Sequence, residues 1–84
     1  MRVNVKYRSQ HLAELAGAAR EEMEAATVKD VLRNIKARCG AEAEKSAKSM
    51  LIAVNGESIL HLRHYQTALR EGDEVSFLPI CGGG

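Results

Sequence analysis

The 84-residue chain closes with GDEVSFLPICGGG, residues 72–84, and this segment says most about the fold. Its first residues favour a turn, and residues 74–78 then largely alternate between polar and apolar side chains. The alternation places Val75 and Phe77 on one face of a strand. Pro79 has no amide hydrogen to donate, so strand pairing is expected to end there. The segment therefore predicts a final β-strand followed by a short tail.

Three glycines, Gly82, Gly83 and Gly84, complete this tail. Glycine has no Cβ, so such a segment can thread a narrow channel and adopt backbone conformations closed to other residues. The four residues from Cys81 onward span up to ~14 Å when extended, far enough to carry the Gly84 carboxylate into the active site of another protein. We therefore expect residues 81–84 to form a flexible tail. From composition alone, a frayed end or an expression scar is an equal alternative.

A carboxylate is a poor electrophile, so chemistry at Gly84 needs a partner that first converts it into an acyl-adenylate. A sulfur nucleophile could then displace the nucleotide and leave a thiocarboxylate. In this interpretation, other proteins recognise the chain by binding its folded domain.

The first half of the chain predicts two helices and two strands. Apolar and polar residues alternate over residues 2–7, as in a half-buried strand, and Ser9 can cap a short helix that Gly17 ends. Residues 19–26 suit a loosely patterned strand or a helix. Apolar residues then recur at helical spacing over residues 28–39, which predicts the main helix.

The second half predicts a hairpin. Residues 41–49 show no apolar face, so we expect a solvated helical extension or a mobile loop. The apolar run 50–54 ends at Asn55-Gly56, a pair that favours tight turns, and residues 57–60 could return as a strand. The predicted order of strands and helices indicates an α+β fold, with residues 1–84 as one domain.

Composition excludes several classes of function. The formal net charge of +1 gives no electrostatic footprint for nucleic acid or a membrane surface. No apolar run is long enough to span a membrane, and we expect no secretory leader. Cys39 and Cys81 do not form a disulfide framework, so a reducing cytoplasm is the expected location.

The closing motif resembles that of the MoaD family, the small subunits of molybdopterin synthase. It follows the family pattern of Gly-Asp-Glu-Val, an aromatic residue, proline and a terminal Gly-Gly, with Gly83 and Gly84 on the terminal pair. Residues 5–7 with 14–17, and residues 52–56, resemble other segments of the family in the same order. Ile80 stands where the family usually has a second proline.

The resemblance implies a ubiquitin-like β-grasp fold: a mixed sheet of about five strands covered by one main helix. It also implies that an E1-like adenylyltransferase of the MoeB or ThiF type consumes ATP to activate Gly84, and that a sulfur donor protein supplies the thiocarboxylate sulfur. A MoaE-like large subunit would then accept the tail during molybdenum cofactor synthesis. The chain would be a sulfur-donating co-substrate and subunit, with no bound cofactor and no catalytic activity alone.

Four residues ahead of the tail form a candidate docking patch for these partners: Phe77, Leu78, Pro79 and Ile80. Core packing is the favoured alternative for Phe77, since alternation points Leu78 and Ile80 away from it. No metal site is expected, because His61 and His64 lack the other ligands of a closed zinc site.

Two other functions remain open. The same tail could serve thiamine thiazole or cysteine synthesis, or could join Gly84 to lysines as a ubiquitin-like modifier. Alternatively, the chain is a non-catalytic β-grasp interaction module with inert glycines.

Overall fold

The computed structural model describes residues 1–80, so the predicted tail over 81–84 lies outside the described residues. The strands, the short first helix and the main helix follow one another in the predicted order, and α3 and two 3₁₀ turns are additional elements. The elements are β1 (Arg2–Tyr7), α1 (Gln10–Ala16), β2 (Arg20–Glu24), α2 (Val28–Cys39), α3 (Ala41–Lys48), β3 (Leu51–Val54), β4 (Glu57–Ser58), the 3₁₀ turns η1 (Ile59–His61) and η2 (His64–Gln66), and β5 (Glu74–Leu78).

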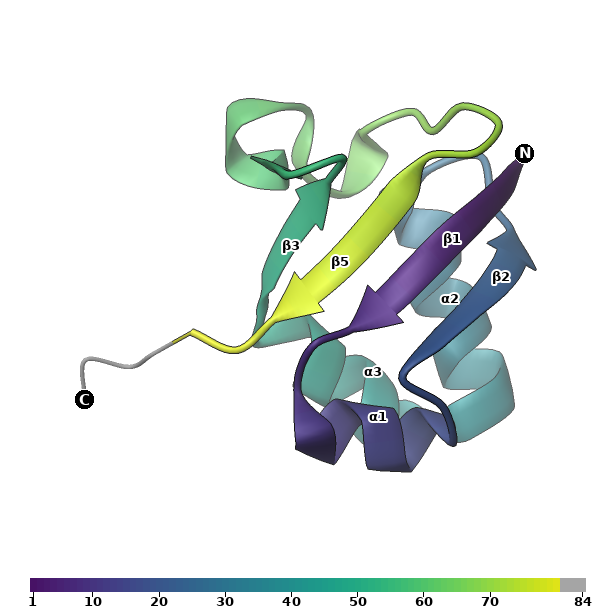
Figure 1. Ribbon diagram of the computed structural model, residues 1–84, viewed down its shortest axis with the longest axis vertical. Helices are drawn as coiled ribbons and strands as arrows, with labels where there is room; N and C mark the ends of the chain where they lie inside the picture. The colour runs from purple at the N-terminus through teal and green to yellow at the C-terminus, as the bar shows by residue number, and fades with distance from the viewer. Residues whose placement is uncertain (81–84) are drawn as a thin grey trace.

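The strands form one mixed sheet in the order β2-β1-β5-β3-β4, so β2 and β4 are its two edges. β1 and β5 run parallel with Val5 opposite Val75, and the other pairs are antiparallel. α2 crosses behind the sheet, and α1 and α3 lie at one end of it (Figure 1). This arrangement confirms the predicted α+β fold of β-grasp type, with two further helices beside the main one.

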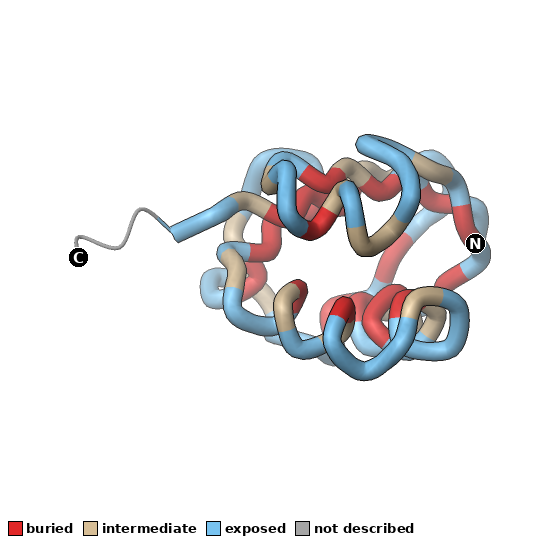
Figure 2. Tube along the Cα trace, turned by 90° about the horizontal axis from the view of Figure 1, so that it is seen from below, coloured by how far each residue is buried: buried red, intermediate tan, exposed pale blue. Residues whose placement is uncertain are grey.

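The hydrophobic core lies between the sheet and the helices. Buried segments of the two layers face each other across the molecule (Figure 2). The alternation of β1 buries Val3, Val5 and Tyr7, and the helical spacing of α2 buries its own apolar stripe. Each large side chain removed from water contributes roughly 1.5–3 kcal/mol to folding. The largest fully buried side chains are Phe77, Leu12, Ile35, Val3, Val5, Val28, Val31 and Val75.

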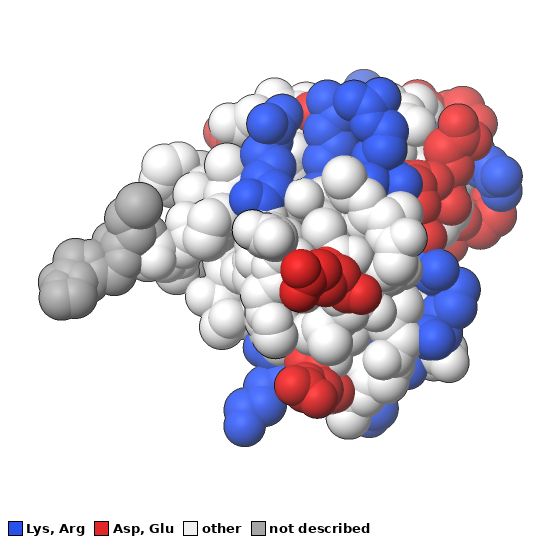
Figure 3. Space-filling view, turned by 60° about the horizontal axis from the view of Figure 1, so that its bottom comes forward, with Lys and Arg blue, Asp and Glu red and all other residues white. Residues whose placement is uncertain are grey.

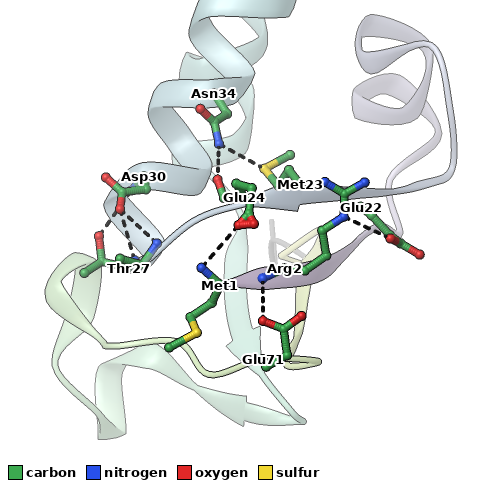
Figure 4. A network of polar contacts seen from close by, with 10 residues as sticks. Met1, Arg2, Glu22, Met23, Glu24, Thr27, Asp30, Asn34 and Glu71 are labelled. Atoms are coloured by element: carbon green, nitrogen blue, oxygen red, sulfur yellow. Dashed lines mark hydrogen bonds and ion pairs between the residues drawn. The ribbon is translucent and has the colours of Figure 1, made fainter.

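Both helices predicted in the first half begin at the caps that the sequence indicates. The Ser9 hydroxyl accepts a hydrogen bond from the Leu12 amide at 3.3 Å, and Gly17 ends α1 in the left-handed conformation. Thr27 and Asp30 form a reciprocal capping box at the start of α2, each side chain accepting from the other's amide at 3.3 Å (Figure 4). The local sequence therefore sets where each helix starts.

Polar contacts tie β2 to its neighbours beside this cap. The Asn34 side chain of α2 donates to the Glu24 carbonyl at 2.8 Å (Figure 4). The Met1 amino group pairs with the Glu24 carboxylate at 3.4 Å, and Arg2 pairs with Glu22 at 3.2 Å. The antiparallel pairing of β2 with β1 makes residues 20–24 a strand, which decides between the two predictions for residues 19–26.

The predicted hairpin forms around Asn55-Gly56. Both residues have positive φ, 52° and 87°, as the tight turn requires. The Asn55 side chain donates to Asp73 at 3.0 Å and accepts from the Glu74 amide at 2.9 Å. The hairpin turn is thereby fastened to the start of β5.

Two local expectations need correction. Residues 41–49 were expected to lack an apolar face, but α3 is a helix whose Ala43 and Ala47 side chains are fully buried. Small side chains allow α3 to pack closely against α1 and α2, so alanine provides the apolar face. The return strand is also shorter than residues 57–60, because the Ser58 hydroxyl caps the 3₁₀ turn that follows it.

Within residues 1–80, no helix is both long and apolar enough to cross a bilayer.

Candidate functional site

The candidate site is the end of β5, where the chain leaves the sheet for residues 81–84. Phe77 is fully buried in the core, so the predicted docking patch presents Leu78, Pro79 and Ile80 and not the Phe77 ring. Leu78 is half-buried, Pro79 is exposed, and the Ile80 side chain is 64% exposed. Three successive residues therefore offer apolar surface immediately before the tail.

The side chains of β1 fix the position of this strand end. Tyr7 stacks on Phe77 with ring centroids 5.8 Å apart and planes inclined by 22°. The Arg8 amide donates to the Phe77 carbonyl at 2.9 Å, which continues the parallel pairing by one residue. These two contacts fix the end of β5, from which Leu78, Pro79 and Ile80 lead on to residues 81–84 of the sequence.

More apolar surface lies next to Ile80. Leu51 is paired with Leu78 across β3 and β5, and Leu60 and Tyr65 come from the two 3₁₀ turns. Leu51, Leu60 and Tyr65 are 38%, 63% and 40% exposed. We call these three residues together with Leu78 and Ile80 the tail-root surface. Uncharged side chains gather where the described chain ends (Figure 3).

Two hollows meet at the tail-root surface. One, of about 230 Å³, has Ile80, Leu60 and Tyr65 in its wall. The other, of about 640 Å³, lies on the outer face of the sheet and has Leu78 in its wall. Leu51 borders both hollows, so a partner that reaches Ile80 can extend across the sheet.

Charges flank the outer hollow. Lys6 and Glu74 form an ion pair at 2.7 Å, and the hydrogen bond from Lys6 lowers the pKa of Glu74. Arg8 lies exposed at the rim of the same hollow. Apolar side chains with a charged rim are the composition of a protein-docking surface.

The structure brings together residues that the sequence analysis did not connect. Leu51, Leu60 and Tyr65 were not among the predicted docking residues. They lie far from Ile80 in the sequence, Leu51 in β3 and the other two in 3₁₀ turns that the sequence pattern did not indicate. Leu51 could have been found by pairing the two predicted strands in antiparallel register. The predicted reactive residue Gly84, with Gly82, Gly83 and Cys81, lies outside the described residues.

Comparisons with known proteins agree with this arrangement. The model of the ThiS family matches residues 8–84. Small archaeal modifier protein 1 from Methanosarcina acetivorans has a TM-score of 0.85 and 28% sequence identity, over 99% of this chain and 96% of that one. A protein described as molybdopterin converting factor subunit 1, from Pyrococcus furiosus, has a TM-score of 0.70 and 29% identity, over 94% and 97%.

A third solved structure shows the same fold at lower identity. It is the complex of subunits 1 and 2 of the molybdopterin-converting factor from Helicobacter pylori, with a TM-score of 0.71 and 21% identity over 100% of both chains. The sequences of curated proteins gave no match. The family match extends from the end of β1 through the terminal glycines. The chain therefore belongs to the ThiS family, whose members are β-grasp sulfur carriers and ubiquitin-like modifiers.

Proposed function

We propose that the chain is a sulfur carrier whose Gly84 carboxylate becomes a thiocarboxylate. An E1-like enzyme of the MoeB or ThiF type joins the carboxylate to the adenylate of ATP, with release of pyrophosphate. A sulfur donor protein then supplies the sulfur that displaces AMP. The chain itself holds no cofactor and acts as the co-substrate.

One observation carries this proposal: the family match runs through Gly82, Gly83 and Gly84, which follow the exposed apolar residue Ile80 closely in the sequence. An inert tail would not need that surface, since an exposed apolar group next to a frayed end offers no benefit to an isolated domain. A carrier does need such a surface, because each partner enzyme has to bind the folded domain while the tail enters the active site of that enzyme.

Molybdopterin synthesis is the pathway we propose for the sulfur. The closing motif from Gly72 to Gly84 resembles that of molybdopterin synthase small subunits, and one neighbour at 29% identity is described as such a subunit. The Helicobacter pylori subunit 1 is found in a complex with subunit 2. We propose a MoaE-like large subunit as the corresponding partner of this chain, docking on Leu78, Pro79 and Ile80.

A second function has support from a different neighbour. Small archaeal modifier protein 1 is 28% identical to this chain, which keeps conjugation of Gly84 to lysines as an alternative use of the same activated tail. Thiazole and cysteine synthesis are further possible destinations of the sulfur. An interaction module with inert glycines is the non-carrier alternative.

Intact-mass measurement tests the carrier chemistry. The protein is incubated with ATP, a MoeB- or ThiF-type enzyme and a sulfur donor, beside a variant that lacks Gly84. A mass increase equal to the exchange of one oxygen for sulfur, absent from the variant, is the expected result. An unchanged mass with several enzymes that are active on their own carriers would favour the interaction module.

The pathway needs a second measurement. The thiocarboxylated protein is mixed with a MoaE-like subunit and the pterin precursor, and dithiolene formation is followed together with loss of the thiocarboxylate. Sulfur transfer is expected. Retention of the thiocarboxylate, with covalent transfer of the chain to lysines in a conjugation assay, would assign the modifier function.

A further inference from the structure

A basic groove lies beside the tail-root surface on the helical side of the molecule. It has a volume of about 380 Å³ and is formed by α2, the end of α3 and η2. Its wall contains the cations Lys29, Arg33, Lys36 and Lys48 and a single carboxylate, Glu44. The overall net charge of +1 does not reveal this local excess of positive charge, because most of the acidic residues lie outside the groove.

Within residues 1–80, three of these cations have no acidic partner. Lys29, Arg33 and Lys36 are exposed, and none of them takes part in the ion pairs found within residues 1–80. Glu44 is already paired with Lys48 at 3.8 Å. The groove therefore presents a strong excess of positive charge that nothing in the described chain neutralises.

The spacing on α2 concentrates this charge along one line. Lys29, Arg33 and Lys36 follow one another at four and three residues, so they share one face of the helix over roughly 10 Å. Like charges at this spacing destabilise a helix by a few tenths of a kcal/mol per pair. A solvated helix face usually mixes both signs, whereas this one does not.

The groove is continuous with the tail-root surface. Tyr65 and Lys48 form part of its wall and also part of the wall of the hollow that contains Ile80. A protein that covers Ile80 therefore reaches the groove without a gap. The two surfaces together form one continuous surface from Ile80 to α2.

We propose that the basic groove docks an acidic segment of a protein partner, with carboxylates opposite Lys29, Arg33 and Lys36. The identity of that partner as the activating or sulfur-accepting enzyme rests on the proposed function. Charge complementarity favours carboxylates as the ligands of the groove. Because the groove adjoins the hollow at Ile80, a protein that also binds the residues around Ile80 is favoured. Nucleic acid fits less well, since the cations cover only about two turns of one helix and Glu21, Glu22 and Glu24 present the opposite sign on β2.

A binding experiment with defined probes tests this site. A fluorescein-labelled peptide of eight glutamates and a labelled single-stranded RNA of eight nucleotides are titrated with the full chain at low salt. The peptide is expected to bind more tightly, with amide chemical shifts changing along α2 and near Lys48 and Tyr65. Tighter binding of the RNA, or no binding of the peptide, would overturn the proposal.

Matched variants locate the interaction. The double variant Arg33→Glu and Lys36→Glu is expected to weaken peptide binding about tenfold or more, and the neutral pair Arg33→Gln and Lys36→Gln by less. The single variant Arg33→Glu should also weaken binding, whereas Arg20→Glu, which makes the same two-unit change of charge on β2 outside the groove, should bind like the unaltered chain. Equal weakening by Arg20→Glu would overturn the proposal.

This test does not depend on the tail. A variant lacking Gly84 should bind the peptide as the full chain does, since Gly84 is not part of the groove wall. If the full chain binds the peptide but is not sulfurated by activating enzymes that are active on their own carriers, the proposed function alone is rejected. Sulfuration with no effect of the groove variants on peptide binding would reject the docking site alone.

Discussion

At the scale of single residues, Tyr7 joins three elements. Its ring is buried in the core and stacks on Phe77, and its hydroxyl donates a hydrogen bond to Glu21 of β2. Arg38 of α2 pairs with the same carboxylate. The alternation of the sequence predicts that Tyr7 faces inward. Its pairing with Glu21 could not be predicted, because the choice depends on the register of two strands and on the distance to α2.

Tyr7→Phe should reduce the free energy of unfolding by about 1.5–3 kcal/mol, the usual effect of removing a hydrogen bond to a charged group while keeping the ring. Burial and the hydrogen bond to Glu21 raise the pKa of Tyr7 above its ordinary value of 10.0. The pKa of Tyr7 is higher in the folded than in the unfolded chain. The stability that the protonated hydroxyl contributes is therefore fully present below pH 10 and is lost as the pH rises further. Urea unfolding at pH 7 and above pH 10 measures both effects.

The matched control for this prediction is Tyr65→Phe. Tyr65 is 40% exposed and should show little change at either pH. If the free energy of unfolding depends on pH equally in the Tyr7→Phe protein and the unaltered chain, Tyr7 does not cause the loss of stability above pH 10.

At the scale of elements, the helix predictions depended on large apolar residues. Thr27, Asp30 and the apolar stripe of α2 made that helix predictable, because caps and periodicity act within a few residues. α3 was not recognised as a packed helix, since its buried positions are Ala43 and Ala47, residues that solvated helices also contain. Close helix packing selects small side chains here, and that selection is set by neighbours distant in sequence.

Ala47→Leu should reduce the free energy of unfolding by about 1–3 kcal/mol, because the larger side chain has to enter a filled core. Ala41→Leu is the control on the same helix, as Ala41 is exposed and its substitution should change stability by less than about 0.5 kcal/mol. Thermal or urea unfolding of both variants provides the comparison. Equal stability of the two proteins would mean that α3 does not pack as described.

At the scale of the whole molecule, the sheet positions the strand end that precedes residues 81–84. The C-terminal end of β5 is held by β1 on one side and β3 on the other, and the surface beside it comes from both β3 and the 3₁₀ turns. The strand and its end at Pro79 followed from local sequence. The tail-root surface did not, because it gathers Leu51, Leu60 and Tyr65 through the topology of the sheet.

Ile80→Asp tests whether this surface serves the carrier function. Ile80 is 64% exposed, so the free energy of unfolding should change by less than about 0.5 kcal/mol. The rate of thiocarboxylate formation at limiting activating enzyme should fall about tenfold or more, since burying one large apolar side chain at an interface contributes roughly 1.5–3 kcal/mol. Ile80→Val is the control and should keep most of the rate. An unchanged rate for Ile80→Asp would place docking elsewhere on the molecule.

The edges of the sheet bear on how the protein behaves in a crowded solution. β2 offers an edge with one arginine and three glutamates among its five residues, and the opposite edge, β4, is only two residues long. Charged or very short edges resist the addition of strands from other molecules, which is how many β-proteins avoid fibrous aggregation. A chain that exposes apolar surface around Ile80 is thereby protected from polymerising through its sheet, even at high local concentration.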